Sequence, residues 1–138
     1  MRRALLLAIL VPAILAACGD DSESGATTSQ TAVRVTVDPD GTGSEPPVTV
    51  RARCRADGGG RGCRELRGVP ANAFRPTPPD TVCTQIFGGP QTARVTGRVR
   101  GKRVDARFAR TDGCEVARWQ LAAPLLALTG VEPGAGAP

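Results

Sequence analysis

The sequence predicts an α+β domain in which short helices accompany an antiparallel sheet. Short runs alternate apolar with polar residues, and Gly, Pro and Asp clusters separate those runs. The chain has 138 residues, which is enough for one domain, but only one Trp, three Phe and no Tyr. Because these aromatics bury little apolar area, we expect disulfides to support the core.

Two strand pairs account for the sheet. Valines alternate with polar residues over residues 33–37, and residues 48–54 repeat the pattern after a turn-forming Asp-Pro-Asp-Gly sequence at 38–41. Further along, residues 93–108 alternate in the same way on both sides of Gly101. We therefore expect a second pair of antiparallel strands that turns at Gly101.

The helices are expected in two short segments. Residues 64–74 have helical composition but contain Gly68 and Pro70, and residues 114–120 suit a helix with Trp119 on its buried side. Residues 121–128 fit either a helix or a strand. Three prolines at positions 76, 78 and 79 predict an extended stretch leading to Cys83.

The N-terminus has the pattern of an export signal. Two arginines precede an uncharged apolar run over residues 4–17, which is shorter than the roughly 20 residues that span a bilayer. The run ends in Leu15-Ala16-Ala17-Cys18, which resembles the lipobox of bacterial lipoproteins. That resemblance implies a signal peptide over residues 1–17 and a lipid on Cys18 that anchors the chain at the extracytoplasmic face of the cell membrane. An ordinary secretion signal is the alternative.

The two ends of the mature chain lack the patterns that predict helices or strands. Residues 18–31 read as a flexible tether, and residues 129–138, rich in Gly, Pro and Ala, read as a disordered tail. The folded domain is expected over residues 32–128.

Four cysteines remain after Cys18 is set aside. An exported chain meets an oxidising compartment, so Cys54, Cys63, Cys83 and Cys114 predict two disulfides. Counting allows three pairings. Since Cys54 and Cys63 flank a Gly-rich turn, we favour the pairs Cys54–Cys63 and Cys83–Cys114.

Several function classes are disfavoured. The chain contains no His, which excludes Ser-His-Asp and Cys-His relays and imidazole metal ligands. The cysteine spacing lacks a C-x-x-C zinc knuckle, and the carboxylates show no paired spacing. We therefore expect no enzymatic activity, no cofactor and no metal.

The chain is basic, with 18 Lys and Arg against 13 Asp and Glu. The strongest run lies over residues 94–110, where alternation places most of its arginines on one sheet face. It lacks the interleaved aromatics of nucleic-acid surfaces, so we expect no nucleic-acid partner. A solvated face or a surface for acidic envelope polymers are the two interpretations. The run contains Arg94, Arg98, Arg100, Lys102, Arg103, Arg107 and Arg110, with Asp105 as its acidic residue.

Most of the chain resembles the Streptomyces subtilisin inhibitor family. The resemblance lies in CTQIFGGP at residues 83–90, the hairpin with Gly-Lys-Arg-Val at 101–104, and the Cys114-Glu115 pair, and it extends over residues 32–128. It implies an antiparallel sheet of about five strands, two short helices, two disulfides and a possible homodimer. It also implies standard-mechanism inhibition of a subtilisin-like serine protease.

The same resemblance assigns the reactive loop. Cys83 would anchor it, Thr84 would be P2, Gln85 P1, Ile86 P1′ and Phe87 P2′. The Gly-Gly pair that follows is expected to loosen the loop. The alternative function is a non-inhibitory envelope-binding or structural lipoprotein with the same fold.

Overall fold

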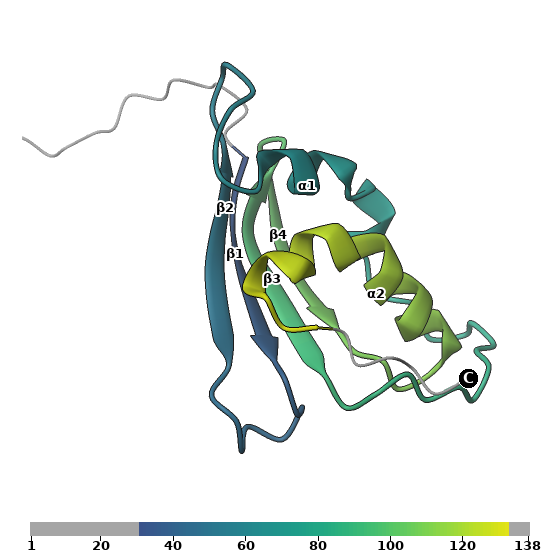
Figure 1. Ribbon diagram of the computed structural model, residues 1–138. Helices are drawn as coiled ribbons and strands as arrows, with labels where there is room; N and C mark the ends of the chain where they lie inside the picture. The colour runs from purple at the N-terminus through teal and green to yellow at the C-terminus, as the bar shows by residue number, and fades with distance from the viewer. Residues whose placement is uncertain (1–30, 133–138) are drawn as a thin grey trace, which may run out of the picture.

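The computed structural model describes residues 31–132, and their strands form one antiparallel sheet (Figure 1). The strand order is β2-β1-β3-β4, and every neighbouring pair is antiparallel. The strands are β1 (Thr31–Asp38), β2 (Val48–Cys54), β3 (Thr92–Val99) and β4 (Lys102–Phe108). The α+β class and the antiparallel pairing are thus confirmed.

Short helices cover one face of this sheet and leave the other open (Figure 1). They comprise α1 (Cys63–Gly68), the 3₁₀ turn η1 (Ala71–Phe74), α2 (Gly113–Leu126) and the 3₁₀ turn η2 (Ala127–Thr129). Within residues 31–132, none of these helices is long and apolar enough to cross a membrane.

The expectation of about five strands is wrong, because the sheet within the described residues has four. Residues 121–126, which fitted either a helix or a strand, continue α2. Residues 75–91 run between η1 and β3 without joining the sheet. Prolines at positions 76, 78, 79 and 90 lack the N–H that a strand would donate to its neighbour.

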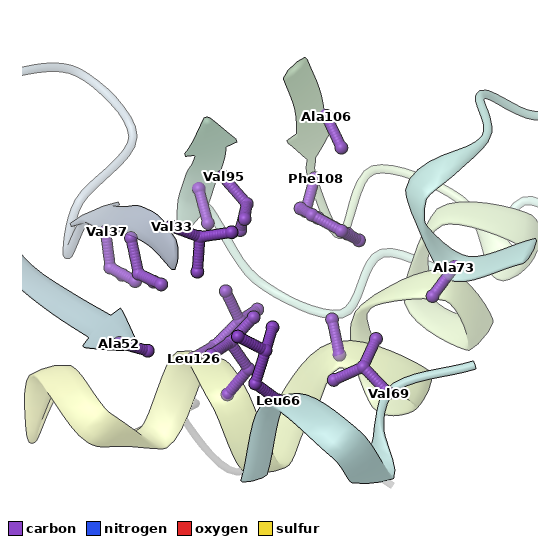
Figure 2. Packing of buried hydrophobic residues seen from close by; sticks show 14 of the residues in the cluster. Val33, Val37, Ala52, Leu66, Val69, Ala73, Val95, Ala106, Phe108 and Leu126 are labelled. Atoms are coloured by element: carbon purple, nitrogen blue, oxygen red, sulfur yellow. The ribbon is translucent and has the colours of Figure 1, made fainter. Parts of the chain in front are cut away.

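The core lies between the inner face of the sheet and the helices (Figure 2). Val33, Val37 and Phe108 point from the strands toward Leu66 of α1 and Leu126 of α2, and each side chain is at most 4 % exposed. Alternation along β1 produces this burial, because every second residue faces the helices. The same alternation sends the intervening polar residues to the open face.

Two turns close the hairpins in different ways. Arg100 and Gly101 both have positive φ (50° and 77°), the conformation of a two-residue turn whose twist matches the flanking strands. Between β1 and β2, the Asp40 carboxylate accepts hydrogen bonds from the backbone N–H groups of Thr42 and Gly43. The bond from Thr42 contributes most to holding the pKa of Asp40 far below its usual range.

The described residues, 31–132, begin and end close to the expected domain limits of 32 and 128. Thr31, the last residue of the expected tether, begins β1 and is buried, and Val131 packs partly buried against the core. The predicted signal peptide, Cys18 and residues 133–138 of the expected tail lie outside the described residues.

Replacement of Leu125 by Ala should lower the free energy of unfolding by about 2–5 kcal/mol, because its side chain is fully buried against the sheet. Leu121→Ala is the matched control, since Leu121 lies on the same helix and is 40 % exposed. Its cost should stay below about 1 kcal/mol. Urea denaturation measures both values, and equal losses would contradict the packing described for α2.

Candidate functional site

An irregular loop runs over residues 81–89 (Figure 1). Several of its apolar side chains are exposed. Val82 is 97 % exposed, Phe87 63 % and Ile86 59 %, and these are three of the four exposed large hydrophobic residues in the described part of the chain. Apolar surface gathered in one place on a soluble domain marks a contact site for another molecule. We therefore treat the 81–89 loop as the candidate site.

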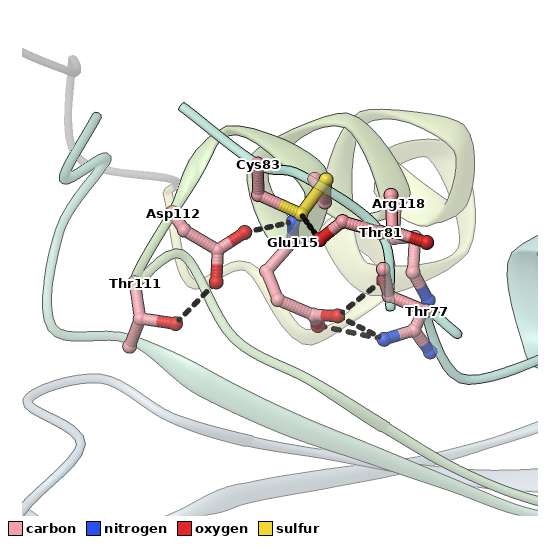
Figure 3. Close-up of a disulfide and its surroundings, with 8 residues drawn as sticks. Thr77, Thr81, Cys83, Thr111, Asp112, Glu115 and Arg118 are labelled. Atoms are coloured by element: carbon pink, nitrogen blue, oxygen red, sulfur yellow. Dashed lines mark hydrogen bonds and ion pairs between the residues drawn. A yellow bond between two sulfur atoms is a disulfide. The ribbon is translucent and has the colours of Figure 1, made fainter. Parts of the chain in front are cut away.

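The N-terminal side of the loop is fixed to the start of α2 (Figure 3). Cys83 forms the predicted disulfide with Cys114, with 5.4 Å between the two Cα atoms. The next residue, Thr84, accepts a hydrogen bond at its carbonyl oxygen from the Gly113 N–H, with an N···O distance of 2.9 Å. The second predicted disulfide, Cys54–Cys63, is also present and joins β2 to α1.

Gly88 fixes the other side of the loop. Its N–H donates to the Arg110 carbonyl oxygen, with an N···O distance of 2.7 Å, and the residue is buried. A Cβ at this position would lie 2.7 Å from Cγ2 of Val116, so glycine permits the close approach to α2. The glycine pair was expected to loosen the loop, whereas the structure holds Gly88 in place.

Arg110 supports this second attachment from inside the protein. Only 8 % of the residue is exposed, and its guanidinium carbon lies 5.7 Å from the centre of the Trp119 ring. Its Nη1 donates to Oε1 of Gln91 at 2.9 Å. Sequence analysis grouped Arg110 with the basic sheet residues, but the side chain instead joins the end of the loop to α2.

The start of α2 is itself held by a polar network (Figure 3). The Asp112 carboxylate accepts from the Glu115 N–H at 3.0 Å, which caps the helix. The Glu115 carboxylate pairs with Arg118 at 2.6 Å and accepts from the Thr77 hydroxyl at 2.9 Å. Because Thr77 lies on the segment leading into the loop, this network ties that segment to the same helix.

Gln85, Ile86 and Phe87 lie between the two attachments, and all three are exposed. Within residues 31–132, the main-chain groups of Gln85 and Ile86 make no intramolecular hydrogen bond. The loop is therefore constrained at its ends, while its middle presents free N–H and C=O groups together with apolar side chains. Free main-chain groups of this kind can pair with the edge strand of another protein.

The structure brings together all five residues that the sequence assigned to the loop, from Cys83 to Phe87. Sequence reasoning missed the supporting roles of Gly88, Arg110 and Gly113. The Asp-Gly-Cys-Glu sequence at 112–115 could have indicated a helix start beneath the loop. No local pattern announces the bond between Thr84 and Gly113, because its partners are 29 positions apart.

No protein-family model, curated protein or solved structure matches this chain.

The disulfide beside the loop should restrict its motion. In Cys83→Ser/Cys114→Ser, native-state hydrogen exchange of the Gly88 and Gly113 amides, whose N–H groups hold the two sides of the loop, should accelerate at least tenfold, since the loop loses its covalent attachment to α2. Cys54→Ser/Cys63→Ser is the control, because it removes a disulfide distant from the loop. Either loss should cost roughly 2–5 kcal/mol of stability, but only the first should change exchange in the loop selectively. Equal acceleration in both variants would remove the anchoring role.

Proposed function

We propose that this chain is a lipid-anchored, extracytoplasmic serine protease inhibitor of the standard-mechanism type, with Gln85-Ile86 as the bond offered to the enzyme. The observation that carries the proposal is the 81–89 loop, which is exposed and apolar in its middle. It is attached to α2 on one side and to Arg110, just before α2, on the other. The resemblance of residues 83–90 to the subtilisin inhibitor family supports the same assignment.

The attachments suit inhibition because they order the loop before it binds. A flexible peptide loses conformational freedom when a protease fixes it, and that loss weakens binding. Here the Thr84 carbonyl is already bonded to Gly113, while the main-chain groups of Gln85 remain available to the enzyme. Alternation along an extended strand directs the groups of neighbouring residues to opposite sides, so this division fits pairing with an enzyme strand.

The same attachments would oppose completion of cleavage. The enzyme's serine oxygen adds to the Gln85 carbonyl carbon, and the enzyme's histidine takes the serine hydroxyl proton. When the C–N bond to Ile86 breaks, the histidine gives that proton to the Ile86 nitrogen. Cys83 and Gly88 hold the two new ends against α2, so the amine stays near the acyl group. Reversal then competes with hydrolysis, and the protease is occupied by a substrate that it releases slowly.

Titration against subtilisin and trypsin tests this proposal. The wild-type chain should inhibit subtilisin, whose broad S1 cleft accepts an uncharged long side chain, and should leave trypsin almost unaffected. Gln85→Lys should create trypsin inhibition, because the lysine can pair with the carboxylate in the S1 pocket of that enzyme. Gln120→Lys is the matched control, an exposed glutamine on α2 that should produce no inhibition of trypsin.

Mass spectrometry identifies the bond involved. Slow cleavage should fall between Gln85 and Ile86, and the two halves should stay joined through Cys83–Cys114 until reduction. Rapid cleavage at scattered sites would contradict a constrained inhibitory loop. Absence of inhibition at micromolar concentration by both wild type and Gln85→Lys would reject the proposal.

The anchor is tested separately. Leu15-Ala16-Ala17-Cys18 supports acylation of Cys18, so the wild-type chain should enter the detergent phase in Triton X-114 partitioning. Cys18→Ser should move it out of that phase, because the substituted residue cannot carry the thioether-linked lipid. Wild-type protein in the aqueous phase, in a bacterium that processes lipoproteins, would contradict the anchor.

A further inference from the structure

The open face of the sheet is dominated by arginine. Because alternate residues of each strand point away from the helices, this face receives the polar positions of all four strands. Sequence analysis recognised only the contribution of the second hairpin. Seven exposed arginines form what we call the arginine face: Arg34, Arg51, Arg53, Arg94, Arg98, Arg103 and Arg107.

Little of this charge is neutralised within the described residues. Asp105 pairs with Arg94 at 2.7 Å, and that hydrogen bond lowers the pKa of Asp105, which therefore stays ionised. Asp38 lies at the far end of β1, where its carboxylate accepts a backbone N–H of the adjoining loop. Across residues 31–132, Arg34 and the arginines of β2 have no carboxylate within ion-pair distance.

The unpaired arginines gather at the end where β1 begins. The strand register places Ala32 opposite Arg53 on one side and Arg98 on the other, and places Arg34 opposite Arg51. Like charges in directly opposed positions destabilise a sheet. The arrangement of Arg34 and Arg51 therefore has no stabilising role in the fold.

A hollow of about 300 Å³ lies among these side chains. Small residues, Ala32 and Gly97, form part of its floor, and Arg34, Arg51 and Arg53 line it. Guanidinium groups bind phosphate oxygens through paired hydrogen bonds. The hollow thus offers a cationic seat for a phosphate-bearing group.

The position of the chain's entry favours a membrane as the source of that phosphate. Twelve residues separate Cys18 from Thr31, and a polar linker of that length spans about 20 Å. The linker joins the sheet at Thr31, which lies at the arginine-rich end. A second copy of the chain is disfavoured on this face, because two arginine faces would repel each other.

We propose that the arginine face docks on anionic phospholipid, with headgroup phosphates bound at the Ala32 end of the sheet. The docking rests on the proposed lipid anchor for its proximity to the bilayer. The exposed large hydrophobic residues of the described chain lie elsewhere, so attraction at this face is electrostatic rather than insertional. The domain would lie with its open sheet against the membrane.

Vesicle co-sedimentation tests the proposal without the lipid. The chain over residues 18–138, carrying Cys18→Ser and exported through a cleavable signal, should bind phosphatidylcholine vesicles that contain one-third phosphatidylglycerol. Binding should be at least about tenfold weaker to pure phosphatidylcholine and should fall steeply as salt rises from about 0.1 to 0.5 M. Because this chain carries no lipid, the vesicle experiment tests the arginine face alone. The detergent-phase experiment tests the lipid anchor alone, so a negative result in one can be told from a negative result in the other.

Matched substitutions locate the effect. Arg34→Gln/Arg51→Gln/Arg53→Gln should weaken binding by more than about tenfold, since each arginine near an anionic surface contributes about fivefold. Arg64→Gln/Arg67→Gln/Arg75→Gln removes the same charge from exposed positions in α1 and after η1 and should change binding by less than about threefold. Lysines at the first three positions should retain most of the binding, which controls for misfolding.

Three outcomes would overturn the proposal. These are equal binding to both kinds of vesicle, equal losses in the two glutamine variants, and binding to soluble poly(glycerol phosphate) without binding to vesicles. The last outcome would assign the face to an envelope polymer instead.

Discussion

Coverage of a four-stranded sheet on one side only is the constraint on which the rest of this structure depends. The valines of β1 and Phe108 of β4 need an apolar layer, and α2 with the short α1 supplies it. Since residues 31–132 supply only one layer of helices, they leave the other face of the sheet open to solvent. Burial therefore divides the molecule into an inner face that holds the fold together and an outer face free to carry charge.

The same packing determines where the loop lies. Because α2 must cover the sheet, its N-terminus comes to rest beside residues 83–88. A disulfide and one backbone hydrogen bond join the loop to the helix, and a second backbone hydrogen bond joins it to Arg110, just before the helix. The Asp112 cap and the Glu115–Arg118 pair then hold that terminus in place. A small core with few aromatics thus gains local rigidity through covalent and polar links at the position where a constrained loop is useful.

The two surfaces that result have opposite chemistry. The 81–89 loop presents apolar side chains and free main-chain groups, which suit a protein partner. The arginine face presents guanidinium groups without a large exposed apolar side chain, which suits phosphate. We infer that one surface binds a protease while the other holds the domain at the membrane. An inhibitor oriented in this way would act on proteases that work close to the cell surface.

Much of this organisation follows from local sequence. Alternation identified all four strands, because side-chain direction in a strand has a period of two. Gly101 indicated the turn, and composition indicated the helical segments. Cys54 and Cys63 flank a Gly-rich turn, which indicated the first disulfide and left Cys83 and Cys114 for the second. The five-strand expectation failed because it came from a resemblance, whereas the prolines of residues 75–91 prevent strand pairing.

Tertiary structure alone decided which distant groups meet. The contact of Gly88 with Val116, the bond between Thr84 and Gly113, and the burial of Arg110 against Trp119 all depend on how α2 lies across the sheet. The arginine face likewise required the strand order β2-β1-β3-β4, which places Arg34 and Arg51 of one hairpin beside Arg98 of the other. Local pattern determines which way each side chain points, but only the packing of the helices and strands determines which residues lie next to it.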